Sequence, residues 1–379
     1  MTLCFIIGSL YPRQEQNAHM YQAQADQYSQ LLNEKVDHVT QLFSSFTLPQ
    51  VDVFASEPVH FRQRAEFRVW HEGDRCFHAM FEPGKKTDPI EITHFDIASE
   101  SICELMPKVM AQINNNPELK HKLFQIEYLA TLSGEMLVTL IYHKPIAEQW
   151  IEQARMLKES LGIQIIGRAR KIRILLDQDY VIETLTVDGK KLHYKQVEGS
   201  FTQPNARMNE KMLSWARACT QDSQHDLLEL YCGNGNFSLA LADQFNRVVA
   251  TEISKTSVKA ALDGKAMNSI ENVDFARVSA EEFTAHMKGI KARRRLKDMG
   301  LESANFGTVL VDPPRAGLDD DSCKLISEYE RIVYISCNPE TLSNNLAVLS
   351  KTHKIERFAM FDQFPYTHHI ECGAYLVKR

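Results

Sequence analysis

Residues 227–242, with the sequence LLELYCGNGNFSLALA, decide how the second half of the chain folds. The apolar run LLELY is typical of a short buried strand, and the residues after the glycines are typical of a helix. Between them, Gly233 and Gly235 allow the backbone to turn tightly and to approach a ligand closely. A strand, a glycine-rich turn and a helix in this order predict a ligand site at the edge of an α/β sheet.

The residues around this turn indicate which ligand it binds. A dinucleotide-binding loop needs a third glycine or an alanine at position 238, where the chain has Ser238. The next predicted strand, RVVATE, ends at Glu252, whose carboxylate can accept hydrogen bonds from both hydroxyls of a ribose. S-adenosylmethionine carries a ribose but no phosphate, so a short G-x-G turn is enough to bind it. The alternative, a turn with a purely structural role, is weakened by Glu252.

The pattern on both sides of the turn predicts the fold of residues 200–379. Five apolar strands alternate with helices, which indicates a mostly parallel sheet with helices on both faces. These strands are LLELY, RVVATE, VDFARV, GTVLVD and RIVYIS. The last two strands, in IERFAMFDQF and IECGAYLVKR, have no helix between them, so we expect an antiparallel pair at the edge of the sheet. This order resembles the Rossmann-like, seven-stranded fold of S-adenosylmethionine-dependent methyltransferases.

The chain before residue 200 has a different pattern. Residues 20–199 contain strands rich in aromatic and β-branched side chains, such as RAEFRVWH, FQIEYLATL and EMLVTLIYH, and helical segments at 98–114 and 146–161. We therefore expect an α+β domain over 20–199, which precedes the α/β domain over 200–379. Residues 1–19 match neither pattern, and we expect them to form a disordered tail.

Composition excludes several classes of protein. The 379 residues carry a net charge of −6, which argues against a protein that simply coats nucleic acid but allows a local basic groove. The eight cysteines include no C-x-x-C pair, so neither a zinc ribbon nor an iron–sulfur cluster is expected. Free thiols fit a reducing cytoplasm. The apolar stretch from Leu3 to Leu10 is too short to span a membrane.

A candidate nucleophile lies in YISCNPETL, residues 334–342. Cys337 ends the fifth predicted strand, where α/β enzymes place reactive groups. A buried structural cysteine is the plain alternative. Methylation of a pyrimidine carbon, however, needs such a thiol: a thiolate that adds to C6 of uracil creates an enolate, which makes C5 nucleophilic.

This chemistry also needs a base, because C5 keeps its hydrogen after methylation. Glu371 begins the last strand, which we expect to lie beside the fifth; an exposed edge carboxylate is the alternative. His368 and His369 are further candidates, more in keeping with structural or RNA-contacting roles. The fourth strand ends in VDPPRAGLD, where two prolines stiffen the turn after Asp312. A D-P-P turn also suggests methylation of an amino group, but Arg315 stands where those enzymes carry an aromatic residue.

These segments together resemble the RNA uracil-C5 methyltransferase family, and within it the bacterial tRNA (uracil-5-)-methyltransferases. The resemblance covers nearly the whole chain after the first twenty residues. It implies methylation of the T-loop uridine at tRNA position 54 to 5-methyluridine, through a covalent cysteine–C6 adduct. Cys337 would be the nucleophile and Glu371 the proton acceptor. The residues that would bind S-adenosylmethionine are Gln203, Tyr231, Asn236, Glu252 and Asp312.

The resemblance also implies partners. The tRNA T-arm would bind largely to residues 20–199, and tmRNA would be a second substrate; no obligate protein partner, metal or iron–sulfur cluster is expected. Ribosomal RNA is the alternative substrate, but family members that act on it often carry a four-cysteine cluster that this chain lacks. Basic runs at HFRQRAEFR, GRARKIR and KARRRLK suggest RNA contacts, or solvated faces. A non-catalytic RNA-binding protein of the same fold is a further alternative.

Overall fold

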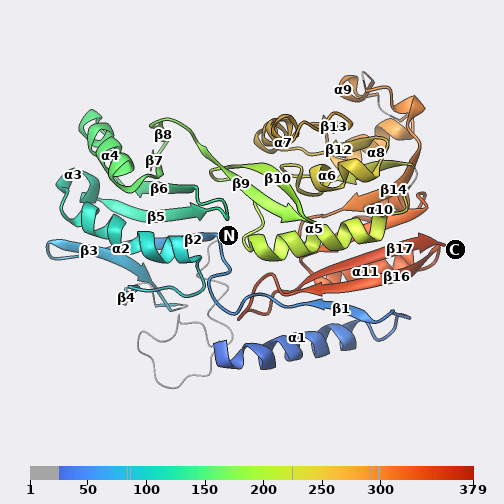
Figure 1. Cartoon of the computed structure of the whole chain (residues 1–379), viewed down its shortest axis with the longest axis horizontal. Helices are drawn as coiled ribbons and strands as arrows, with labels where there is room; N and C mark the ends of the chain where they lie inside the picture. The colour runs from blue at the N-terminus through green and yellow to red at the C-terminus, as the bar shows by residue number, and fades with distance from the viewer. Residues whose placement is uncertain (1–24, 83, 86, 224, 291, 298) are drawn as a thin grey trace.

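The computed structural model describes residues 25–379 except 83, 86, 224, 291 and 298 (Figure 1). The expected disordered tail, 1–19, lies outside the described residues. The described chain forms an eight-stranded, a seven-stranded and a two-stranded sheet. In Figure 1 the two large sheets lie side by side, and the hairpin of β9 and β10 lies between them.

The eight-stranded sheet has the order β1-β16-β17-β15-β14-β11-β12-β13. Its strands are Val51–Phe54 (β1), Asp226–Leu230 (β11), Val248–Thr251 (β12), Val273–Ala276 (β13), Phe306–Val311 (β14), Arg331–Ser336 (β15), His353–Phe361 (β16) and Glu371–Lys378 (β17). Strands β11 to β15 are mutually parallel, which confirms the predicted alternation of strands and helices. Strand β17 pairs antiparallel with both β15 and β16, so the predicted final hairpin is also confirmed.

The expected edge position of this hairpin is wrong. Strand β1 pairs parallel with β16, from Val51 opposite Phe358 to Phe54 opposite Phe361, and so adds an eighth strand beyond the hairpin. The pairing joins segments about 300 residues apart, and a four-residue strand carries too little periodicity to reveal it in the sequence. Residues 51–54 therefore share a sheet with the C-terminal half of the chain, whereas the division at residue 199/200 stays a prediction.

Helices cover both faces of the eight-stranded sheet. Val39 and Phe43, on and just after helix α1, pack with residues of α8, α10 and α11 on one face. On the other face, Met212 and Trp215 of α5 pack with Phe237 of α6 and with the β9–β10 hairpin. The helices are Tyr28–Leu42 (α1), Ala206–Thr220 (α5), Asn236–Leu241 (α6), Lys255–Met267 (α7), Ala280–Met287 (α8), Arg294–Lys297 (α9), Asp320–Ile326 (α10) and Pro339–Leu349 (α11), with short 3-10 turns at Ala25–Gln27, Ala242–Gln244 and Leu301–Ser303.

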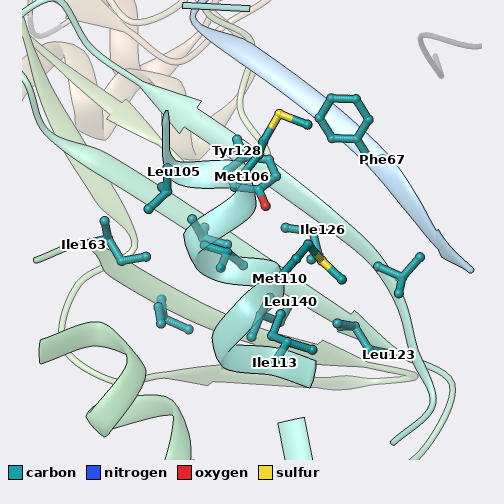
Figure 2. Packing of buried hydrophobic residues seen from close by; sticks show 14 of the residues in the cluster. Phe67, Leu105, Met106, Met110, Ile113, Leu123, Ile126, Tyr128, Leu140 and Ile163 are labelled. Carbon is teal, nitrogen blue, oxygen red and sulfur yellow. The ribbon is translucent and has the colours of Figure 1, made fainter. Parts of the chain in front are cut away.

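The seven-stranded sheet has the order β4-β3-β2-β5-β6-β7-β8 and is antiparallel except between β6 and β7. Its strands are Arg64–Glu72 (β2), Arg75–Met80 (β3), Ile90–Glu91 (β4), Leu123–Ala130 (β5), Met136–Tyr142 (β6), Gln164–Ala169 (β7) and Ile172–Leu175 (β8). Helices Glu100–Asn114 (α2), Pro117–Lys120 (α3) and Glu148–Leu161 (α4) accompany it, so the two predicted helical segments are confirmed to within two residues. Figure 2 shows Met106, Met110 and Ile113 of α2 over Ile126 and Leu140 of the sheet.

The hairpin of β9 (Tyr180–Val187) and β10 (Lys190–Val197) joins the two large sheets. Its turn, Asp188–Gly189, has positive φ at both residues, as a tight two-residue hairpin requires. On β9, Glu183 accepts a hydrogen bond from the Leu132 amide, beyond β5. Close by on the neighbouring strand, Lys195 pairs with Asp263 of α7 at 2.7 Å. Of the helices that the structure describes, none combines the length and the apolar character needed to cross a bilayer.

Candidate active site

The predicted residues meet where the parallel strands of the larger sheet end. Leu230 of β11 lies opposite Thr251 of β12 and Val311 of β14, so the residues that follow these three strands are neighbours. They are Tyr231, Glu252 and Asp312. Strand β15 continues the row on the far side of β14 and ends one residue before Cys337. The carboxyl end of the sheet thus gathers four of the predicted side chains.

Glu371 joins this row because β17 runs in the opposite direction. Strand β17 begins at Glu371, and its pairing with β15 places Cys372 opposite Ser336. In an antiparallel pair the next residues in register are Cys337 and Glu371 themselves. The Glu371 side chain is buried, with 3% of its surface exposed, whereas Cys337 is half-buried. The predicted neighbourhood of the last and fifth strands is confirmed.

Burial and mutual charge raise the pKa values of these groups. Burial raises the pKa of the Cys337 thiol to about 12, and the charges of Glu371 and Asp312 add to this increase. Burial also holds the pKa of Glu371 well above its ordinary value, with a further contribution from Asp312. The pKa of Asp312 is raised to about 7 by burial. In each case the ionised form is disfavoured, so at neutral pH the free protein holds Cys337 as a thiol.

Arg315 is the cation that opposes these increases. Its charge lowers the pKa values of both Cys337 and Glu371. The Arg315 guanidinium lies 3.2 Å from the ring nitrogens of His369. Burial, followed by the charge of Arg315, lowers the pKa of His369 to about 4, so this ring is neutral at pH 7 and can accept the hydrogen bond. The Arg315 carbonyl is fixed in turn by the Asn338 side chain, which donates to it at 2.9 Å.

The glycine-rich turn is held by Glu252. One carboxylate oxygen of Glu252 accepts from the Gly233 amide at 3.1 Å, and the other accepts from the Ser254 amide at 2.7 Å. Gly235 has a φ of 82°, and a Cβ there would lie 3.1 Å from the Phe275 ring, so only glycine fits without strain. Tyr231 also has a positive φ, 64°, which is uncommon for an aromatic residue and marks a constrained turn.

The two remaining predicted residues are carboxamides held by other side chains. Asn236, the first residue of α6, exchanges two hydrogen bonds with Asn209 of α5, at 2.8 and 2.9 Å. Gln203 accepts a hydrogen bond from Gln363 at 2.6 Å. Gln363 lies in the loop 362–370, between β16 and β17, and so connects Gln203 to the segment that leads into Glu371.

Sequence reasoning missed these supporting residues. Asn209 and Gln363 occur in segments that the resemblance covers, but no spacing rule distinguishes them from other polar residues. Glu229, inside β11, was also missed: it is buried and accepts a hydrogen bond from Ser238 beneath the turn, and burial raises its pKa to about 8. A charged residue within the apolar run LLELY was the available signal.

Three arginines of the basic runs contact other side chains of the protein. Arg168 and Arg173, from GRARKIR, both bind the buried carboxylate of Glu198, which engages part of their charge internally. By contrast, the Arg68 guanidinium lies over the Phe124 ring, 3.6 Å from its centre.

Among the described residues, no group of three or more His, Cys, Asp or Glu side chains is placed to hold a metal ion.

Comparison with known proteins gives consistent matches over most of the chain. A family model described as tRNA (Uracil-5-)-methyltransferase matches residues 27–379. The tRNA/tmRNA (uracil-C(5))-methyltransferase of Vibrio atlanticus (strain LGP32) is 53% identical over 359 residues, which cover 93% of this chain and 97% of the relative. The protein of the same name from Cellvibrio japonicus (strain Ueda107) is 52% identical over 368 residues, covering 97% and 100% of the two chains.

A solved structure supports the fold. The crystal structure of Pyrococcus abyssi tRNA (uracil-54, C5)-methyltransferase in complex with S-adenosyl-L-homocysteine matches with a TM-score of 0.70. It is 20% identical in sequence and covers 92% of this chain and 83% of its own. At this level of identity the match shows that the two chains share a fold.

The raised pKa of Cys337 can be tested without any ligand. Glu371→Gln removes one of the charges that disfavour the thiolate. Cys337 should therefore be alkylated by iodoacetamide about 3- to 10-fold faster at pH 9, because one pKa unit changes the thiolate fraction about tenfold. Arg315→Gln, the matched control, should slow alkylation. Peptide mass spectrometry identifies the modified cysteine. Equal rates in the three proteins would show that these charges do not act on Cys337.

Proposed function

The chain belongs to the tRNA (uracil-5-)-methyltransferase family, and we propose that it methylates C5 of the T-loop uridine 54 of tRNA, giving 5-methyluridine, with S-adenosylmethionine as the methyl donor. By the same resemblance, tmRNA is a second substrate. The observation that carries this proposal is the register of β15 and β17, which sets Cys337 opposite Glu371. A thiol beside a buried carboxyl group is what C5 methylation through a covalent adduct requires.

The residues around the glycine-rich turn fit S-adenosylmethionine. We assign its binding to Gln203, Tyr231, Asn236, Glu252 and Asp312. The turn carries Gly235, where a side chain would meet the Phe275 ring. The carboxylate of Glu252 contacts the turn through the Gly233 amide, and its oxygens have lone pairs left for ribose hydroxyls. When bound, S-adenosylmethionine supplies an electrophilic methyl group. The chain supplies the groups that make C5 of uracil reactive toward that methyl.

In the proposed cycle, the Cys337 thiol gives up its proton to solvent, and the resulting thiolate adds to C6 of the flipped uracil. The Sγ–C6 bond forms, and the electrons of the C5–C6 double bond move into an enolate, so C5 becomes nucleophilic. Arg315 favours this step because its charge is the one that stabilises the thiolate. After C5 is methylated, Glu371 takes the C5 proton; the double bond re-forms and the Sγ–C6 bond breaks, which frees the thiolate.

The raised pKa of Glu371 suits this last step. A carboxylate with an ordinary pKa is a weak base, whereas one whose pKa is raised by burial holds an abstracted proton more tightly. His369 is less suited to the role, because its pKa is lowered to about 4 and Arg315 lies against its ring. Two features thus favour the carboxylate over the neighbouring imidazole.

The proposal also covers the RNA-binding region, the cellular compartment and protein partners. We propose that the T-arm binds mainly to the 20–199 region, that the enzyme acts in the cytoplasm, and that it needs no obligate protein partner. The T-loop uridine must leave the folded tRNA elbow to reach Cys337, at an unstacking cost of a few kcal/mol. Ribosomal RNA is the alternative substrate, and methylation of an amino group is the alternative chemistry.

The function is tested directly by locating the product. Incubation with S-adenosylmethionine and tRNA that lacks T-loop modifications should give one 5-methyluridine per tRNA, at position 54, as mapped by nuclease digestion and mass spectrometry. Cys337→Ala should give none, since no adduct can form. Normal methylation by Cys337→Ala would favour amino-group chemistry. Methylation of ribosomal RNA but not tRNA would favour the alternative substrate.

The assignment of Glu371 gives a separate prediction. Glu371→Gln should still form the adduct and methylate C5, but should release the RNA about 10²–10⁴-fold more slowly, because a general base typically contributes that factor. A methylated RNA joined covalently to the protein should therefore accumulate and survive a denaturing gel. If Glu371→Gln turned over normally and left no adduct, another residue would be the base.

The assignment of Glu252 concerns only the methyl donor. Glu252→Ala should weaken S-adenosylmethionine binding by about 1–3 kcal/mol, because the ribose hydroxyls lose a charged acceptor. Calorimetry measures this affinity, and tRNA affinity should stay nearly unchanged. Unaltered S-adenosylmethionine affinity would remove Glu252 from the site.

A further inference from the structure

We propose that Lys35, on helix α1, is a positioning residue for the release step: it holds the 362–370 loop in the conformation that places Glu371 against the substrate carbon. This inference rests on the proposed function, because it concerns the group assigned there as proton acceptor. It assigns a role to a helix near the start of the chain, far in sequence from the site residues.

The Lys35 ammonium is buried and makes three contacts. Its side chain lies against Asp362 at 2.6 Å, and only 8% of Lys35 and 1% of Asp362 are exposed. It also donates to the carbonyl oxygens of Phe364 at 2.8 Å and His369 at 3.1 Å. An ammonium group has three protons, so these contacts use its full donor capacity.

All three acceptors belong to the loop between β16 and β17. Asp362 directly follows the last residue of β16, and His369 is two residues before Glu371, which begins β17. One ammonium group therefore ties together the two ends of the loop. Within the loop, Thr367 donates to the Phe364 carbonyl at 2.9 Å and accepts from the His369 amide at 3.2 Å.

The loop touches the site at two other points. Gln363 donates to Gln203, which we assign to the methyl donor, and the His369 ring lies against Arg315. Movement of the loop would therefore disturb Arg315 and Gln203 as well as Glu371. A lysine that served only to attach α1 to the sheet would not need two backbone carbonyls of this loop as acceptors.

Burial of the Lys35–Asp362 ion pair costs desolvation free energy, which indicates a role beyond stability. Burial lowers the pKa of Lys35, and the charge of Asp362 opposes that decrease. Buried ion pairs generally contribute little net stability, but loss of one partner leaves the other charge uncompensated. A test of positioning must therefore remove both charges together, so that no unpaired Asp362 unfolds the loop.

The test compares Lys35→Met/Asp362→Asn with Lys211→Met. The double variant removes the ion pair and both carbonyl contacts; Lys211, on α5, binds one backbone carbonyl, that of Ala55, outside the loop. Both should melt cooperatively near the wild-type temperature. In single-turnover reactions with unmodified tRNA, the double variant should release the RNA at least about tenfold more slowly, since small displacements of catalytic groups cost about that much or more. Methyl transfer should slow by a smaller factor, through the contacts of the loop with Arg315 and Gln203.

Protein–RNA adduct on denaturing gels is the readout. It should accumulate in the double variant and stay at the wild-type level in Lys211→Met. A folded double variant with normal release would overturn the proposal, as would equal slowing in Lys211→Met or equal slowing of methyl transfer and release. Failure of the wild-type protein to methylate tRNA or to form an adduct would instead contradict the proposed function.

Discussion

The antiparallel pairing of β17 with β15 is the constraint on which the site depends. In a wholly parallel sheet, the start of a strand lies at the edge opposite the catalytic rim, where the other strands end. Because β17 is reversed, its first residue, Glu371, lies at the rim, opposite Cys337. The hairpin with β16 makes this reversal possible, and the loop between the two strands delivers Glu371 from a fixed direction.

The same pairing places ionisable groups close together, and the charges of surrounding residues act on their pKa values. The charges of Glu371 and Asp312 disfavour the Cys337 thiolate, and the charge of Asp312 also disfavours ionisation of Glu371. Arg315 opposes this effect from the turn after β14, and Lys35 neutralises Asp362 at the start of the loop that precedes Glu371. A raised pKa brings a carboxyl group closer to the range in which it can exchange a proton with a substrate.

Much of this could be predicted from the sequence, because the alternating apolar strands and the turn residues are local signals. Cys337 and Glu371 each lie next to such a strand, so their proximity followed from strand order. The position of β1 and the role of Lys35 could not be predicted. Both depend on contacts across some 300 residues, and a lysine in an amphipathic helix has no local sign that it is buried. The role of Gln363 is likewise visible only in the structure, where its side chain donates a hydrogen bond to Gln203.

The central claim, that Cys337 forms a covalent bond to C6 of the T-loop uridine, is tested most directly with 5-fluorouracil-substituted tRNA. Fluorine cannot leave C5 as a cation, so the wild-type protein should stop after methyl transfer with the RNA still attached. Digestion with trypsin and nuclease, followed by tandem mass spectrometry, should locate a methylated fluorouridine nucleotide on the peptide that contains Cys337. Absence of an adduct under conditions where unsubstituted tRNA is methylated, or an adduct on a different residue, would contradict the account.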